Sequence, residues 1–264
     1  MVVHGPNGCI RGQRLTADAL GPDRGEMGSR SSAVFWGAIA VTAVLLLVDL
    51  FDVALNGSAI RSELSVDYRL YIDAARSWLH GGPFFQPYQL AGPYQISAGD
   101  ILYPPVALVL FVPFTFLPAV LWWLIPAVAV GWSLIRLRPR AITWPLLALC
   151  IAWPPTLVKV VTGNPVMWAV AAMALGVVYA WPSVLVLIKP SLFPFALFGA
   201  RRRAWWLALG AFVLVSLPFG SLWLDWVTSV LNSQGGGLAY SSLEVPMLAL
   251  PLIAWLGRTR IETA

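Results

Sequence analysis

The 264-residue chain is 59% hydrophobic and only 11% charged, and its mean hydropathy is +0.76. A water-soluble domain of this length does not carry so much apolar side chain, so the composition predicts an all-α, polytopic protein of the cell membrane. The net charge of +5 comes mainly from arginine clusters between apolar runs. Such clusters are typical of cytoplasmic membrane loops beside anionic lipid headgroups, and they do not indicate a nucleic-acid partner.

Metal and disulfide chemistry find no support in the sequence. The two cysteines, Cys9 and Cys150, and the two histidines, His4 and His80, are far apart in the chain and have no ligand spacing. We therefore expect neither a metal nor another cofactor.

The chain begins with residues 1–32, which show no apolar period and are predicted to be a disordered cytoplasmic tail. Residues 33–55 are the first predicted span, because the run is too long for a removable signal peptide and lacks a small-residue cleavage site. Asp49 and Asp52 are spaced i, i+3 near its outer end. They either mark the exit from the membrane or face a polar cavity.

Residues 56–102 form a polar island between apolar runs and are the predicted outer catalytic loop. The island holds four carboxylates, whereas no acidic residue lies between Asp100 and Asp225. Within it, residues 66–80 follow the helical period and predict an amphipathic helix in the membrane interface. The polar face of this helix carries Arg69, Asp73, Arg76, Ser77 and His80, and the apolar face carries Asp67, Leu70, Tyr71, Ala74 and Trp78.

The two aspartates of this helix have different expected roles. Asp73 follows Arg69 by four residues and precedes Arg76 by three, which predicts a surface ion pair. Asp67 has no such helical partner, and on the aromatic face partial dehydration would make its carboxylate a usable proton acceptor. The other interpretation of Asp67 is an acidic residue that the helix dipole favours near an N-terminus.

Prolines divide the later apolar runs, notably at Pro118 and Pro182, because proline ends or bends a helix. The sequence then predicts about eight spans, at residues 33–55, 103–118, 119–135, 141–159, 164–181, 183–200, 204–223 and 244–257. The transmembrane domain is thus 33–257, followed by a short tail at 258–264.

The positive-inside rule orients these spans only in part. With the N-terminus inside, the polar island and residues 225–243 lie outside, while the arginines at 201–203 and at 258–260 lie inside, as the rule requires. The arginines at 136–140 fall outside, against the rule.

The only two lysines of the chain both lie in apolar sequence. Lys159 lies near a predicted span end, where its side chain can reach the cytoplasmic surface. Lys189 lies inside a span and precedes Pro190, which opens the helix and frees backbone carbonyls. A cation at this depth indicates a functional site, with an anionic lipid phosphate as its natural partner; the other interpretation is a structural contact.

Several short motifs occur in a characteristic order: Asp67-Tyr68, Tyr71, Ala74-Ala75, Gly81-Gly82, Pro87-Tyr88 and Tyr103-Pro104-Pro105, then Lys189-Pro190 before the arginines at 201–203, and Asn232-Ser233 with a glycine-rich stretch. This order resembles glycosyltransferase family 87, the polyprenyl-phosphate-mannose-dependent mannosyltransferases of the GT-C superfamily, over about residues 34–257. Two features depart from the family. Gly163-Asn164-Pro165 stands where a Gly-Gln-x-Asn type motif is usual, and several C-terminal spans are missing, as in a short variant or a fragment.

The resemblance implies an inverting transfer of a hexose from a polyprenyl-phosphate donor to a hydroxyl of a lipid or glycan acceptor on the outer face. Asp67 would be the base, and Lys189 would bind the donor phosphate together with Arg69 or Arg76. Tyr71 would contact the substrate, and the Tyr103-Pro104-Pro105 turn would shape the pocket rim; the other interpretation of this turn is a plain helix start. Inversion in one displacement needs a base and an electrostatic cradle, and a lysine or arginine can supply the charge that a metal supplies elsewhere.

Two other functions fit the same sequence. A lipid or solute transporter would use Lys189 with Asp49 and Asp52 as a coupled pair within the membrane, although we find no internal repeat of the kind common in transporters. An inactive assembly partner of a glycosyltransferase is the third possibility, and the missing C-terminal spans favour it.

Overall fold

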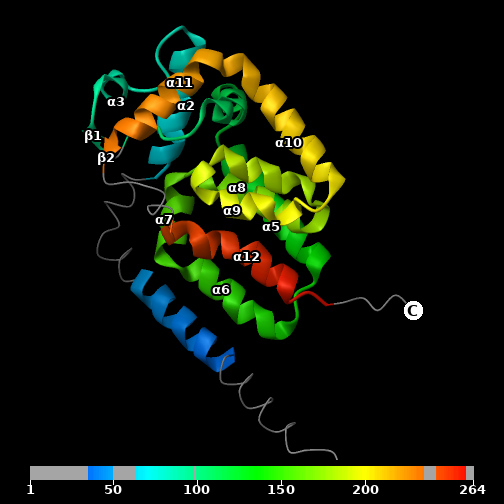
Figure 1. Cartoon of the computed structure of the whole chain (residues 1–264). Coiled ribbons are helices and arrows are strands. Elements are labelled where there is room, and N and C mark those ends of the chain that lie inside the picture. Colours follow the sequence, from blue (N-terminus) through cyan, green and yellow to red (C-terminus); the bar gives the residue numbers. More distant parts are fainter. Residues whose placement is uncertain (1–34, 50–63, 98, 235–241, 260–264) are drawn as a thin grey trace, which may run out of the picture.

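The computed structural model describes residues 35–49, 64–97, 99–234 and 242–259, and there the protein is all-α, as predicted (Figure 1). The first described helix is Phe35–Asp49. Two short strands, β1 (Tyr94–Gln95) and β2 (Ser233–Gln234), pair in parallel. The tail predicted at residues 1–32, Asp52, and residues 260–264 lie outside the described residues.

Fewer helices than expected have the length of a membrane span. Two are long and apolar enough: α5 (Val120–Leu137) and the segment Arg203–Asn232, which joins α10 (Arg203–Ser216), η8 (Leu217–Phe219) and α11 (Gly220–Asn232). A third is possible if α6 (Trp144–Ala152), which follows η4 (Ala141–Thr143), and α7 (Pro154–Thr162), bent by 59°, cross as one unit.

The other predicted spans are shorter apolar helices of 10–17 residues. They are Phe35–Asp49; η2 (Pro105–Ala107), α4 (Leu108–Phe111) and η3 (Val112–Thr115); α8 (Val166–Tyr179); η6 (Pro190–Leu192), α9 (Phe193–Ala196) and η7 (Leu197–Gly199); and α12 (Val245–Leu256). About 20 residues are needed to cross a bilayer core. Within the described residues, fewer helices than predicted have the length of a span, because 3₁₀ turns and breaks divide the apolar runs that hydropathy shows as continuous.

The expected breaks are present. Pro118 separates η3 from α5, and Ala180, with a φ of 68°, ends α8 before η5 (Trp181–Ile188). Lys189 is extended between η5 and η6, so the predicted opening of the helix before Pro190 is observed.

Helix α8 is the centre of the core, and most of its side chains are buried between α5, η5 and α12. Small residues permit this close packing: a Cβ on Gly176 would lie 2.8 Å from the Cβ of Ser183 in η5. An aromatic cluster continues the core toward α2 (Val66–Leu79), and it contains Tyr71, Tyr103, Phe111, Phe114, Trp122 and Trp168.

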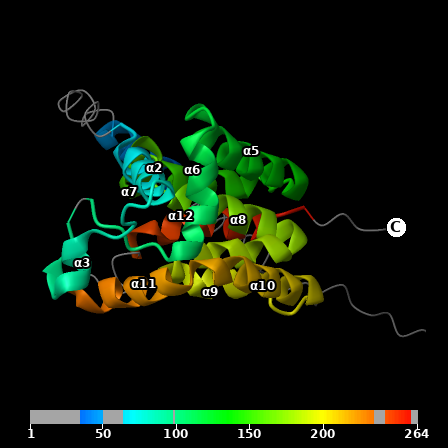
Figure 2. The ribbon, with the colours of Figure 1, turned by 90° about the horizontal axis from the view of Figure 1, so that it is seen from above.

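The polar and basic segments collect at opposite ends of the protein (Figures 1 and 2). Helix α2, α3 (Pro87–Ala91), β1 and β2 lie at one end. The C-terminal end of α12 and the beginning of α10 lie at the other.

The arginine turn after α5 belongs to this second end. Pro139 forms a bridge with Arg258, and the amide of Arg140 donates to the Gly257 carbonyl at 2.9 Å. Residues 136–140 therefore lie beside Arg258, and the prediction that put these two basic segments on opposite sides of the membrane is wrong. Residues 105–115, predicted as part of a full span, form only a short apolar helix.

Candidate functional site

The predicted amphipathic helix is present as α2. Arg69, Asp73, Arg76, Ser77 and His80 are exposed, whereas Asp67, Leu70, Tyr71, Ala74 and Trp78 are buried or half-buried. The predicted surface ion pair also forms, since Arg76 Nη1 donates to Asp73 Oδ1 at 2.7 Å. Asp67 and Asp73 thus share a helix but face different surroundings.

Asp67 is held by the turn that follows α7. Its Oδ2 accepts hydrogen bonds from Thr162 Oγ1 at 2.8 Å and Asn164 Nδ2 at 2.7 Å. Both bonds use Oδ2, so Oδ1 is the oxygen through which this carboxylate could accept a proton. Asp67 is also in the first turn of α2, so the dipole interpretation is compatible with the same geometry.

Glycine is required in this turn. Gly163 has a φ of +74°, and a Cβ there would lie 2.8 Å from both the Tyr68 Cβ and the Trp123 ring. The close approach of α2 to the turn brings Asp67 within reach of Asn164. Gly163-Asn164-Pro165, noted in the sequence only as a departure from a family motif, is thus a central part of the site.

Asn164 connects Asp67 to Tyr103. The hydroxyl of Tyr103 donates to Asn164 Oδ1 at 3.3 Å, and the ring of Tyr103 packs edge-on against Tyr71 at 5.0 Å. The Nζ of Lys189 lies 5.6 Å from the centre of the same Tyr103 ring, within range of a cation–π contact. The negative charge of Asp67 also attracts the Lys189 ammonium group.

Lys189 forms a buried ion pair with Glu244, the residue just before α12. Lys189 Nζ donates to Glu244 Oε1 at 2.6 Å, and Lys159 Nζ lies 3.8 Å from the same oxygen. Glu244 is only 2% exposed, and its Oε2 has no hydrogen-bond partner among the described residues. We call the connected set the charged network: Asp67, Tyr103, Lys159, Thr162, Asn164, Lys189 and Glu244.

Glu244 is the member of the charged network that sequence reasoning missed. It was placed at the start of the last predicted span without a role. A signal was available, because two lysines in a stretch without acidic residues need counter-ions from elsewhere. Glu244 is the charged residue that immediately precedes the final apolar run.

The remaining predicted residues lie around the charged network. Tyr71 is buried and stacks on Phe111 at 5.1 Å. Pro104 is buried beside Tyr103, and its carbonyl accepts from Ala107 in η2. Arg69, whose Nη2 donates to the Leu64 carbonyl, and Arg76 lie on the exposed face of α2, away from Lys189. Their role as phosphate ligands stays a prediction.

A second polar cluster joins α3 to α11. The amide Nε2 of Gln89 lies within hydrogen-bonding distance of Tyr94 Oη at 3.0 Å, Ser229 Oγ at 3.1 Å and the Ile101 carbonyl at 3.2 Å. Asn232 Nδ2 donates back to the Gln89 carbonyl at 3.0 Å. We call Gln89, Tyr94, Ser229 and Asn232 the neutral network, because none of its members is charged.

Asp100, the last carboxylate of the polar island, lies close to the neutral network. It accepts hydrogen bonds from the Tyr88 hydroxyl and from the Ser97 amide, the latter at 2.6 Å. The bond to this carboxylate raises the pKa of Tyr88. These contacts give Asp100 a structural explanation that does not involve Asp67.

Metal binding is not indicated in the described part of the chain, where no three His, Cys, Asp or Glu side chains come together. The positive charges near Asp67 are lysine ammonium groups. The arrangement therefore offers a carboxylate acceptor and a cationic partner within one buried network.

Comparison with known proteins adds no relative: no family model, curated protein or solved structure matches this chain. The likeness to glycosyltransferase family 87 therefore rests on the short motifs themselves and stays a prediction.

Proposed function

We propose that this chain is an inverting membrane glycosyltransferase that moves a hexose, mannose in the first instance, from a polyprenyl-phosphate donor to an acceptor hydroxyl. The observation that supports the proposal is the link between Asp67 and Lys189. These two residues were singled out separately in the sequence, and Asn164 and Tyr103 connect the half-buried Asp67 to the buried Lys189.

The proposed reaction is a single displacement. The acceptor oxygen attacks the anomeric carbon, the bond from that carbon to the phosphate oxygen breaks, and the phosphate leaves with the electron pair. Asp67 takes the proton of the acceptor hydroxyl, and Lys189 balances the charge on the departing phosphate. Tyr71, Tyr103 and Pro104 line the substrate side of the network, and Arg69 and Arg76 are further contacts for the donor from the outer surface of α2.

A transfer assay tests this role for Asp67. General-base help is worth about 10²–10⁴-fold in rate, so Asp67→Asn should reduce transfer of radiolabelled mannose from polyprenyl phosphate by that factor. Asp73→Asn is the matched control, because it changes a carboxylate on the same helix that faces solvent. A wild-type level of transfer by Asp67→Asn, in a variant shown to be folded, would assign the base elsewhere.

The alternative with a specific observation in its favour is a transporter. A buried Lys189–Glu244 pair between apolar helices, with one carboxylate oxygen that has no partner in the described part of the chain, is a feature of proton- or ion-coupled sites. The acid paired with Lys189 is Glu244, so a coupled pair of Lys189 with Asp49 or Asp52 is not the form of transporter that we favour.

Flux of protons or solute in proteoliposomes, together with no transfer of sugar, would favour the transporter. The absence of both activities would favour an inactive assembly partner.

We further propose that the protein is a multi-pass protein of the bacterial plasma membrane, with the end that carries α2 and α3 outside. The opposite end carries the arginines at 136–140, the arginines at 201–203 and Arg258 (Figure 2). The positive-inside rule places this basic end in the cytoplasm. In a chain with Cys9 and Cys150 replaced by serine, Gln95→Cys should react with an impermeant thiol reagent added outside, and Arg201→Cys should not. Equal labelling of both positions from outside would overturn the orientation.

A further inference from the structure

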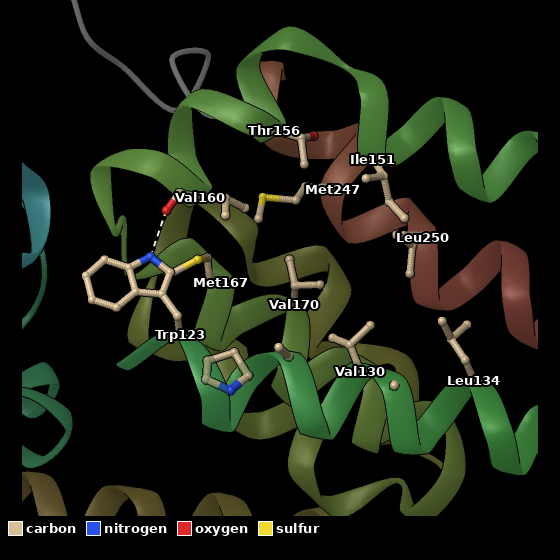
Figure 3. A pocket seen from close by; sticks show the side chains of 13 residues that line it. Trp123, Val130, Leu134, Ile151, Thr156, Val160, Met167, Val170, Met247 and Leu250 are labelled. Atoms are coloured by element: carbon tan, nitrogen blue, oxygen red, sulfur yellow. Dashed lines mark hydrogen bonds between the residues drawn. The ribbon is translucent and has the colours of Figure 1, made fainter. Parts of the chain in front are cut away.

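An apolar cavity of about 410 Å³ lies beside the charged network, between α5, α6, α7, α8 and α12 (Figure 3). Trp123, Val130 and Leu134 extend into it from α5, and Met247 and Leu250 from α12. Its volume is in the range of roughly 300–1,000 Å³ that is typical of ligand pockets. The cavity is therefore large enough to hold part of a small molecule.

The side chains that line the cavity are almost all apolar. The two lining side chains with polar groups already use them: Trp123 Nε1 donates to the Val160 carbonyl at 2.8 Å, and Thr156 Oγ1 donates to the Cys150 carbonyl at 3.0 Å. A sugar or another polar molecule would lose its hydrogen bonds to water here without replacement. An alkyl chain would lose none.

The cavity is open to the surface along one side. Ile151 and Val160 line it, and they are 51% and 38% exposed. They belong to the pair of helices α6 and α7, which has the apolar length of a membrane span. A chain from the surrounding bilayer could therefore enter from this side.

A positive charge lies at the α7 end of the cavity. Lys159 adjoins Val160, and its side chain is 32% exposed. Glu244 lies one helical turn before Met247 and pairs closely with Lys189 at 2.6 Å, whereas Lys159 Nζ lies 3.8 Å from the same Glu244 oxygen and is held less closely. Lys159 is the more accessible lysine of the two and is the one available to an external anion.

We propose that this cavity and Lys159 form a binding site for a membrane lipid with a phosphate headgroup, with one hydrocarbon chain in the cavity and the phosphate against Lys159. This assigns to Lys159 a ligand, where the sequence predicted only a side chain that reaches the cytoplasmic surface; the contact of α2 with the turn after α7 places Lys159 near the end that carries α2. The site does not require the transfer reaction proposed above, because a bound lipid need not be a reactant.

Photolabelling of the full chain in nanodiscs of an uncharged galactolipid tests the proposal. The probes are phosphatidic acid and diacylglycerol that carry the same photoactivatable group in one acyl chain, and labelled residues are identified by mass spectrometry. We expect phosphatidic acid to label cavity residues such as Met167 and Met247 about fivefold more strongly than diacylglycerol, which is the effect of one lysine near a lipid phosphate. Lys159→Gln should remove this preference and leave the Lys189–Glu244 pair in place.

Gly131→Leu blocks the cavity without crowding the protein. Gly131 lines the cavity, and a Cβ there meets no atom within 4 Å. A leucine takes the place of about three methylenes of the chain, so labelling by both probes should fall at least about tenfold. Gly210→Leu is the matched control, because Gly210 lies in α10, equally uncrowded, and does not line the cavity.

Wild-type labelling of Gly131→Leu would overturn the cavity as the chain site. Equal labelling by the two probes, unchanged in Lys159→Gln, would overturn the headgroup contact. Each result concerns binding alone, so it is distinct from a failure of sugar transfer.

Discussion

The charged network and the neutral network both tie the polar island to distant helices, yet they are built differently. The neutral network joins α3 to α11 through amides and hydroxyls, with Gln89 fully buried. The charged network joins α2 to the turn after α7, to the break at Lys189 and to the start of α12. One is held by neutral hydrogen bonds, and the other buries charge.

This difference distinguishes polar groups that hold two segments together from polar groups that are candidates for chemistry. A buried amide with its hydrogen bonds satisfied fixes how two segments pack and leaves little for a ligand to gain. A buried lysine and glutamate are costly to desolvate, and Glu244 also has an oxygen without a partner in the described structure. This cost is the reason that we propose a functional site at the charged network and not at the neutral network.

The largest expected effect comes from removing the counter-ion of Lys189. Glu244→Leu leaves a buried ammonium without its close partner, which should lower stability by about 3–5 kcal/mol. The measurement is thermal unfolding of the purified protein in detergent. The double variant Lys189→Met/Glu244→Leu should recover most of the loss, because no buried charge remains unpaired. A single variant as stable as the wild type would show that this pair is not buried in the manner described.

A smaller effect is expected in the neutral network. Gln89→Ala removes the Gln89 hydrogen bonds to the Ile101 carbonyl and to Ser229, which keeps only its contact with Tyr94, at a cost of about 1–3 kcal/mol. Faster amide hydrogen exchange in residues 86–102, with sugar transfer retained, would distinguish this structural role from a catalytic one. Loss of transfer at unchanged stability would contradict the division between the two networks.

The smallest effect is expected at the exposed ion pair of α2. The side chains of Asp73 and Arg76 are 66% and 52% exposed, so Asp73→Asn should change stability by no more than about 1 kcal/mol. Thermal unfolding at low and high salt is the measurement, and the small difference from the wild type should shrink as salt screens the pair. A larger loss would mean that Asp73 has a partner beyond Arg76.

Local features were predictable from the sequence. The bounds and faces of α2, the Asp73–Arg76 pair, the break at Lys189 and the break near Pro118 all follow from interactions between residues a few positions apart. The number of spans was not predictable in this way. Hydropathy shows an apolar run, but the several 3₁₀ turns and prolines within these runs leave most helices too short to cross a bilayer alone.

The sequence by itself determined that the described part of the protein is all-α, and it predicted the polar island and the roles of Asp67 and Lys189. Only the tertiary structure decided that Asn164 and Tyr103 lie between them, that Glu244 is the counter-ion, and that the arginines at 136–140 lie beside Arg258. The physical reason is the range of the interactions. Helical periodicity specifies which residues share a face, whereas the pairing of buried charges depends on where broken helices end and on how closely glycines such as Gly163 let their neighbours approach.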